Sequence, residues 1–247
     1  MSAVTQQATV RVYQLKIALR DSTPMIWRRL LVTSDTTIAR LHDMLQIAMG
    51  WEDLHLQRFR IHGRAYGIYR DGGMSFADNP HQTLLADFKL RKAERFVYEY
   101  DLGDCWQHDI WIEQILPRDP RKHYPLCTDG HGNCPPEDCG GPRGFMRLMA
   151  ERDSGMALLH RHADQALVAQ RLLDWYDGGP RPAYDDAAFM DALERMRDWL
   201  DNAPSVFNRR TVNAALRTQR KERSCTSAST SSPSRTTAPS TTRRSPT

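Results

Sequence analysis

The segment Tyr124–Phe145 constrains the fold more than any other stretch of this chain. Its 22 residues include three of the five cysteines, five glycines and four prolines. Glycine and proline at this density impose backbone angles that interrupt helices and strands. We therefore predict a long structured loop here, rather than a helix or a strand. A loop of this kind, between a strand-rich half and a helix-rich half, is where a site is expected.

Before this loop the apolar residues alternate as they do in β-strands. The pattern is clearest at 95–101, where Phe96, Tyr98 and Tyr100 share one face, and at 105–116 beyond a Leu-Gly-Asp turn. These two stretches predict an antiparallel hairpin. Three further strands are predicted at residues 10–19, 25–32 and 54–62.

In most of the remaining segments the apolar residues recur at helical spacing, which predicts helices. One helix is predicted up to Met49, with Ser34, Asp35 and Thr36 as capping residues and Gly50 as its stop. One helical turn is predicted at 84–88, and residues 70–80 are expected to form a loop. Four helices are predicted after the loop, at residues 145–153, 156–176, 185–200 and 206–216. This order predicts an α+β fold with an antiparallel sheet, packed helices and a helical C-terminal half.

The charge of the chain is concentrated at its C-terminal end. Residues 1–216 carry 27 basic and 29 acidic side chains, so the net charge of +4 arises from the seven basic residues that follow. Beyond Arg217 the sequence is rich in Ser, Thr, Pro and Arg and has almost no apolar residues to bury. We predict a flexible N-terminus at 1–9, one domain at 10–216 and a disordered basic tail at 217–247. The tail is the predicted site of weak nucleic-acid contact.

The start of the chain has no basic and apolar pattern typical of a secretory signal, and no apolar run has the length of a membrane helix. We therefore expect a cytoplasmic protein without membrane contact. The five cysteines are then expected to be reduced, so metal binding or simple burial is favoured over disulfides.

Five short motifs occur in an order that resembles the Ri-plasmid open-reading-frame-three family, a bacterial domain of unknown function. The resemblance covers residues 10–215. It implies an α+β fold with an antiparallel sheet, and an association with plasmids or other mobile elements. The motifs are Val12-Tyr13-Gln14-Leu15-Lys16-Ile17, Ile26-Trp27-Arg28-Arg29, Ala48-Met49-Gly50-Trp51, Tyr98-Glu99-Tyr100-Asp101 and Pro135-Pro136-Glu137-Asp138-Cys139-Gly140-Gly141.

An acidic cluster with one histidine is the first candidate site. Carboxylates with one imidazole could bind a hard divalent ion or serve as acid and base. The cluster exists only if the turn at 101–105 lies against the loop at 134–141. The alternative is that the acids form turns and cap backbone amides, and that the histidine is buried in the core. The candidate residues are Asp101, Asp104, His108, Glu137 and Asp138.

The cysteines of the loop are the second candidate site. Three thiolates with one imidazole suit zinc, and Cys127, Cys134, Cys139 and His131 are the candidate ligands. The fourth position could instead be taken by His123, Cys105 or His108. The spacing is not the tight Cys-x-x-Cys pair of strong zinc motifs. The alternative is that the cysteines pack as ordinary small apolar residues.

Two further groups of residues are weaker candidates for binding. Arg28 and Arg29 could contact phosphate, whereas strand geometry requires at least one of them to point to solvent. The aromatic residues Tyr98, Tyr100, Trp106 and Trp111 would form a stacking platform if exposed, and core if buried. The sequence favours a binding or accessory module over an enzyme. A metal-dependent hydrolase using the Asp/Glu/His cluster is the first alternative, and a nucleic-acid binder is the second.

Overall fold

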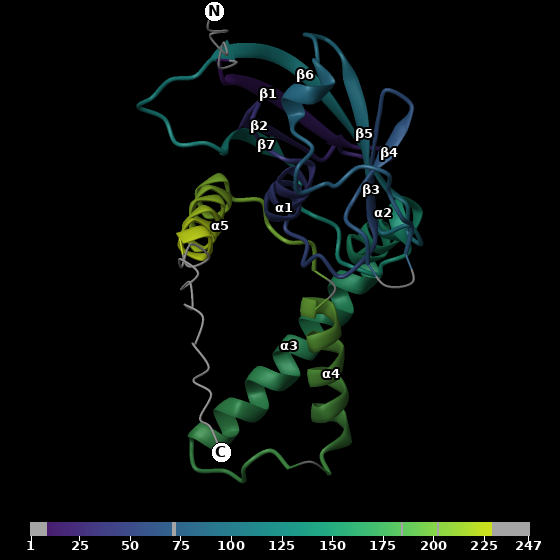
Figure 1. Cartoon of the computed structure of the whole chain (residues 1–247). Coiled ribbons are helices and arrows are strands. Elements are labelled where there is room, and N and C mark those ends of the chain that lie inside the picture. Colours follow the sequence, from purple (N-terminus) through teal and green to yellow (C-terminus); the bar gives the residue numbers. More distant parts are fainter. Residues whose placement is uncertain (1–8, 71–72, 184, 202, 229–247) are drawn as a thin grey trace, which may run out of the picture.

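The computed structural model describes residues 9–70, 73–183, 185–201 and 203–228, with backbone alone for 220–228. The chain forms a twisted antiparallel sheet with helix α1 packed against it, and α3 and α4 project from this body as a helical hairpin (Figure 1). The strands are β1 Arg11–Leu19, β2 Trp27–Thr33, β3 Gln57–Ile61, β4 Arg64–Tyr66, β5 Arg95–Tyr100, β6 Trp106–Pro117 and β7 Leu126–His131. The helices are α1 Ile38–Met49, the 3₁₀ helix η1 Leu85–Phe88, α2 Gly141–Arg152, α3 Gly155–Tyr176, α4 Ala187–Asp201 and α5 Arg209–Ala228. The α+β class is confirmed.

The sheet has seven strands in the order β4-β3-β5-β6-β1-β2-β7, and all neighbouring strands are antiparallel. In the predicted hairpin, Tyr98 of β5 lies opposite His108 of β6, and Tyr100 lies opposite Trp106. All four side chains are buried. Because side chains alternate along a strand, this face forms the core with α1 and the other face stays polar.

Helix α1 begins one residue later than the sequence predicts. Thr37 is its N-cap, and its side chain accepts a hydrogen bond from the Arg40 amide. Ser34, a predicted cap, instead accepts a hydrogen bond from the Arg11 amide through its hydroxyl. Gly50 ends the helix in the left-handed region at φ 106°, as predicted.

The prediction that Tyr124–Phe145 contains no strand or helix is wrong at both ends of the segment. Leu126–His131 forms β7, which pairs with β2, and α2 begins at Gly141. The pairing satisfies the backbone groups of β2, which would otherwise be a free sheet edge. A Cβ at Gly130 in this strand would lie 2.6 Å from the ring of Phe207, so a larger residue there would displace that ring. Composition alone does not reveal such pairing.

Helix α5 continues past the predicted boundary at residue 217, without interruption to Ala228. Residues 217–223 are mostly Arg, Lys, Gln and Glu, which have high helix propensity. A helix already anchored at Val212 and Leu216 can extend through such residues. The rest of the predicted tail, 229–247, lies outside the described residues, as does most of the N-terminal segment. No helix in the described ranges has the length and apolar content needed to cross a membrane.

Arg28 of β2 is the largest charged side chain in the core, with no exposed surface. Its guanidinium donates hydrogen bonds to backbone carbonyls of Ala48 at 2.7 Å and His131 at 2.9 Å, and it lies 4.1 Å from the ring of Phe207. Burial lowers the pKa of Arg28 to about 10. Arg28 thereby joins the end of α1 to β7 and is not available to phosphate. Its neighbour Arg29 lies on the polar face.

We predict that Arg28→Ala lowers the free energy of unfolding by about 3 kcal/mol, because buried carbonyl oxygens lose their donors and a cavity remains. The matched control is Arg29→Ala, which removes a part-exposed ion pair with Glu113 and should cost less than about 1 kcal/mol. Urea denaturation measures both variants. Equal losses would contradict the structural role given to Arg28.

Candidate functional site

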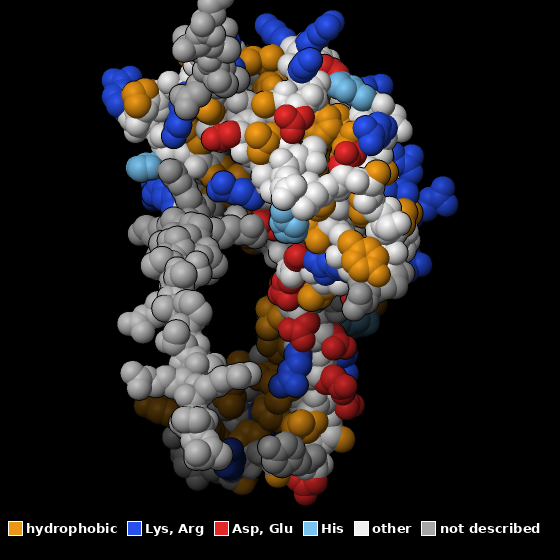
Figure 2. Space-filling view, in the orientation of Figure 1, with side chains coloured by type: hydrophobic (Ala, Val, Ile, Leu, Met, Phe, Trp, Pro, Cys, Tyr) orange, Lys and Arg blue, Asp and Glu red, His pale blue; other side chains and the backbone are white. Residues whose placement is uncertain are grey.

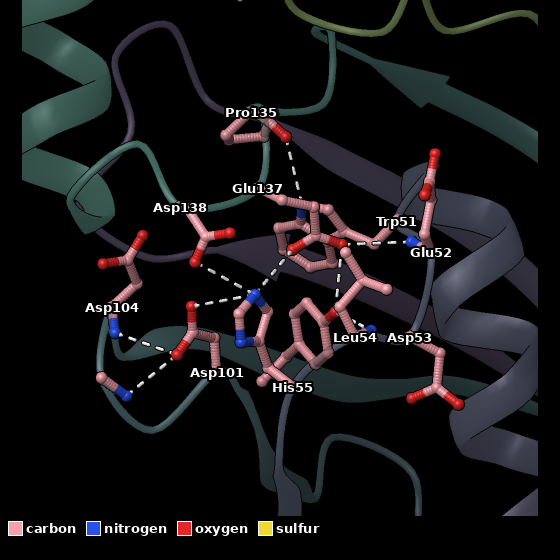
Figure 3. Close-up of polar contacts among 12 residues, drawn as sticks. Trp51, Glu52, Asp53, Leu54, His55, Asp101, Asp104, Pro135, Glu137 and Asp138 are labelled. Carbon is pink, nitrogen blue, oxygen red and sulfur yellow. Dashed lines mark hydrogen bonds and ion pairs between the residues drawn. The ribbon is translucent and has the colours of Figure 1, made fainter.

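Four polar side chains from three separate segments converge at one end of the sheet (Figure 3). We call His55, Asp101, Glu137 and Asp138 the His55 cluster. The Nε2 atom of His55 lies 3.2 Å from Asp138 Oδ1, 3.7 Å from Glu137 Oε2 and 3.8 Å from Asp101 Oδ2. The cluster is largely enclosed, but the Asp138 side chain is 72% exposed. The site is therefore a part-buried acidic centre that opens to solvent at Asp138.

Asp101 directly follows β5 and is fixed by the turn that it begins. Its Oδ1 atom accepts hydrogen bonds from the amides of Gly103 at 2.9 Å and Asp104 at 3.2 Å. Its backbone is left-handed, at φ 52°, as is that of Asp138 at φ 54°. Non-glycine residues with such angles are uncommon, and they concentrate at functional sites. The turn leaves Oδ2 of Asp101 directed at His55 (Figure 3).

Glu137 is held through one oxygen and leaves the other free. Its Oε1 atom accepts hydrogen bonds from the Glu52 amide at 3.1 Å and from the Tyr100 hydroxyl at 3.0 Å. Burial, together with the charge of Glu137, raises the pKa of Tyr100 above its usual value, so the phenol remains a donor. Oε2 of Glu137 is buried and has no hydrogen-bond partner within the described structure.

The segment that carries His55 is fixed by side chains of the core. The indole of Trp51 donates a hydrogen bond to the Pro135 carbonyl at 3.1 Å, which ties this segment to the loop. Gln46 of α1 accepts a hydrogen bond from the Asp53 amide at 3.0 Å, and Tyr100 accepts one from the Leu54 amide at 3.0 Å. These contacts position the segment that carries the imidazole, and none of them uses the Nε2 atom of His55.

Nε2 of His55 is buried, and none of its carboxylate neighbours meets it with hydrogen-bond geometry. The ion-pair distance of 3.2 Å to Asp138 is short, but the atoms are not aligned as donor and acceptor. The nitrogen therefore faces the space between the carboxylates rather than any single oxygen. Three carboxylates around one imidazole also make the cluster negative, which attracts cations.

The donor atoms of this cluster have the composition and spacing of a metal site. One atom each from His55, Asp101 and Asp138 lie within 4.8 Å of one another. Donors bound to an ion at about 2.1 Å stand about 3.0–3.4 Å apart. The distances of 3.2 Å and 3.8 Å from Nε2 are close to that spacing, so small side-chain rotations would complete it. Glu137 lies just outside this group of three.

Four of the five candidate residues of the predicted acid–histidine cluster lie in one neighbourhood. The predicted contact between turn and loop is found, since Asp104 Oδ2 accepts a hydrogen bond from the Gly140 amide at 3.1 Å. Asp101, Glu137 and Asp138 surround His55, and Asp104 borders them (Figure 3). Their functional role remains a prediction.

His108 is not part of this site. It is fully buried on β6, 5.3 Å from the ring of Trp51 and 5.4 Å from that of Tyr98 between ring centroids. Burial lowers the pKa of His108 to about 4, so it is a neutral core residue. The histidine of the site is instead His55, which falls within the strand predicted at 54–62. The observed strand β3 begins only at Gln57, so His55 lies in the short connection between the end of α1 at Gly50 and β3. A histidine in such a connection is the sequence feature that could have indicated the site.

The predicted convergence of the cysteines is not found. Among the side chains described, no group of three potential ligands contains Cys127, Cys134, Cys139 or His131. Cys127 and Cys134 are buried in the core, and the Cys127 thiol donates to the Asp129 carbonyl. Burial raises the pKa of Cys127 and Cys134 and raises that of Cys139 to about 11. With raised pKa values these thiols stay neutral and pack as small apolar groups.

Of the other binding candidates, some side chains lie in the core and others on the surface. Tyr98, Tyr100 and Trp106 are buried, whereas Trp111 lines a shallow groove on the polar face of the sheet. Arg217 of α5 is exposed and lines a second groove with Arg209 and Arg210. The remaining basic residues of the predicted nucleic-acid contact have side chains outside the described structure.

Comparisons with known proteins agree on fold and family but name no activity. The sequence model of the family described as "Plasmid pRiA4b ORF-3-like protein" matches residues 11–192. The uncharacterized protein y4hQ of Sinorhizobium fredii (strain NBRC 101917 / NGR234) is 37% identical over 138 residues, 56% of this chain and 71% of that protein. The crystal structure of the protein of unknown function MM3350 from Methanosarcina mazei Go1 matches with TM-score 0.57 and 27% identity, covering 82% of this chain and 96% of that one.

The contact between turn and loop depends on Gly141, and this dependence can be measured. A Cβ at Gly141 would lie 2.4 Å from the Asp104 carbonyl oxygen, whereas at Gly140 the nearest atom would be 3.6 Å away. Both glycines have positive φ, so Gly140→Ala is the matched control for backbone strain. We predict that Gly141→Ala lowers the free energy of unfolding by about 2 kcal/mol more than Gly140→Ala does. Equal losses in urea denaturation would show that the close approach is not required.

Proposed function

We propose that this chain, which belongs to the plasmid pRiA4b ORF-3-like family, binds one divalent metal ion at the His55 cluster. The observation that carries the proposal is the convergence of three carboxylates on the buried, unpartnered Nε2 atom of His55. The binding module predicted from the sequence is then a metal-binding one. Its ligands are the imidazole of His55 and the carboxylates of Asp101 and Asp138.

The donor set favours particular ions. Magnesium and calcium prefer oxygen ligands alone, whereas an imidazole suits transition metals and zinc. One imidazole with two carboxylates therefore favours manganese or zinc. Three protein ligands leave at least one coordination position for water or for a substrate oxygen.

The same geometry has a simpler interpretation, in which His55 forms an ion pair with the carboxylates and no metal is bound. A protonated His55 would then donate to Asp138, and the other two carboxylates would lie near a positive charge. Two features favour the metal. Nε2 is not aligned with any carboxylate oxygen, and Oε2 of Glu137 is buried without a donor. An ion between these atoms, with its bound water, would satisfy both.

A hydrolytic role is the second candidate, and the position of Glu137 favours it. A metal ion of this kind lowers the pKa of its bound water and so generates a nucleophile. Oε2 of Glu137 lies 3.7 Å from Nε2 of His55 and would be the group to accept a proton from such a water. The exposed side of the cluster at Asp138 would admit a substrate.

We predict that the metal-free chain binds about one equivalent of manganese or zinc in isothermal titration calorimetry. His55→Ala and Asp101→Asn should each weaken binding by at least about 10-fold. The matched control is His62→Ala, since His62 is an exposed histidine that pairs with Glu94 elsewhere on the surface. If wild type binds neither ion, or if His62→Ala has the same effect as His55→Ala, the site is not a metal centre.

Glu137→Gln separates metal binding from hydrolysis. We predict that it preserves metal affinity but lowers metal-dependent hydrolysis of a chromogenic phosphodiester or ester by about 100-fold. Glu52→Gln is the matched control, because the Glu52 carboxylate points away from the cluster (Figure 3). Metal binding without hydrolysis of either probe would overturn the hydrolytic role and leave a metal-binding protein. Hydrolysis insensitive to Glu137→Gln would overturn the role of Glu137 as its base.

A further inference from the structure

One side of helix α3 packs against α4, and the buried and ion-paired residues of α3 lie on this side. Val168 is buried against Phe189 and Ala192 of α4. Asp164 forms an ion pair with Arg195 at 2.7 Å, and Arg171 forms one with Asp186 at 3.0 Å. The hairpin therefore has its own small core, set apart from that of the sheet (Figure 1).

The opposite side of α3 is exposed and carries a line of apolar residues flanked by the polar residues His162 and Gln170. Leu159, Ala166 and Leu173 are spaced by seven residues, which places them within about 20° of one line along the helix. Val168 points about 160° away from Ala166. Leu159 is 61% exposed and Leu173 is 56% exposed. Figure 2 shows apolar side chains along the flank of the hairpin where α3 lies, and acidic ones along the other flank.

On this surface, which we call the α3 stripe, the leucine and alanine positions are arranged symmetrically about Ala166. Leu159 and Leu173 lie seven residues from the centre, and Ala163 and Ala169 lie three residues from it. Met156, 62% exposed, and Tyr176, 86% exposed, lie ten residues from it. In an antiparallel pair with a two-fold axis at Ala166, Leu159 meets Leu173 and Ala163 meets Ala169. The exposed polar residues His162 and Gln170, about 40° from the line of Ala166, meet each other. A two-fold interface requires this kind of self-complementary patch.

We propose that a second copy of this chain packs on the α3 stripe, with the two α3 helices antiparallel and Ala166 at the two-fold axis. The charged groups Arg161 and Asp164 contact α4, and Arg171 contacts Asp186 just before it, so this pairing would not desolvate them. Small residues at 163, 166 and 169 allow the helix backbones to approach closely. This inference does not depend on the metal site.

The segments of the chain outside the described structure are poor occupants of this surface. Residues 1–8 and 229–247 contain no Leu, Ile, Phe, Tyr or Trp to cover an apolar stripe. A single helix pair about 33 Å long buries less than the roughly 800 Å² per partner of a standard interface. We therefore expect a concentration-dependent dimer rather than a permanent one.

Sedimentation equilibrium of the full chain tests the proposal. Wild type should show a monomer–dimer equilibrium, and Ala166→Glu should weaken the dimer by at least about 10-fold by placing two carboxylates together at the axis. Glu is a good helix former, so the fold is expected to survive. The matched control is Leu172→Glu, which adds the same charge at a 46% exposed position about 120° from the stripe. A wild-type monomer, or equal effects of the two variants, would overturn the proposal.

Disulfide formation provides a second readout that does not rely on loss of association. In a background with Cys105→Ser and Cys225→Ser, Ala166→Cys should form a covalent dimer on mild oxidation, and Leu172→Cys should not. If wild type is monomeric but a chain ending at residue 228 dimerises through the stripe, the C-terminal residues are the occupant. That outcome would also overturn the proposal.

Discussion

The close approach of Gly141 to the turn at Asp104 is the constraint on which the candidate site depends. The Asp104 carbonyl occupies the space of a Cβ at residue 141, and the Asp104 side chain accepts from the amide of Gly140. Only glycine permits this contact. It brings the end of β5, with Asp101, against the loop that carries Glu137 and Asp138. The third segment is added by the hydrogen bond between Trp51 and Pro135.

Buried polar contacts beneath the site hold the histidine segment in register with the sheet. His42 of α1 bridges the Tyr98 hydroxyl and the Asp53 carboxylate, at 2.8 Å in each case. The His42 and Arg70 contacts lower the pKa of Asp53, so this carboxylate is ionised and holds the start of the segment. Arg28 ties the end of α1 to β7 through the carbonyls of Ala48 and His131. The site is thus supported by hydrogen-bonded groups rather than by mobile surface loops, which suits a preorganised metal centre.

The parts of this structure that could be predicted from sequence are those in which the pattern is local. Alternation at Phe96, Tyr98 and Tyr100 indicated the central hairpin, and the motifs around it placed Asp101 and Glu137 in turns that could meet. β7 was missed because its pairing with β2 depends on a distant partner and not on its own composition. His55 was missed for a similar reason, because its orientation depends on distant partners. Its neighbours Trp51, Asp53 and Leu54 are held by Pro135, Gln46 and Tyr100. The extension of α5 past Arg217 was missed because low apolar content excludes a packed core but not a solvated helix.

The most direct test of the metal centre is the position of the ion itself. Crystals grown from the full chain with manganese, measured at a wavelength where manganese scatters anomalously, locate the ion without reference to activity. We predict one strong anomalous peak about 2.1 Å from Nε2 of His55, with Asp101 and Asp138 oxygens at similar distances. A fully occupied ion bound elsewhere, or no peak at the His55 cluster under saturating manganese and zinc, would contradict the proposed function.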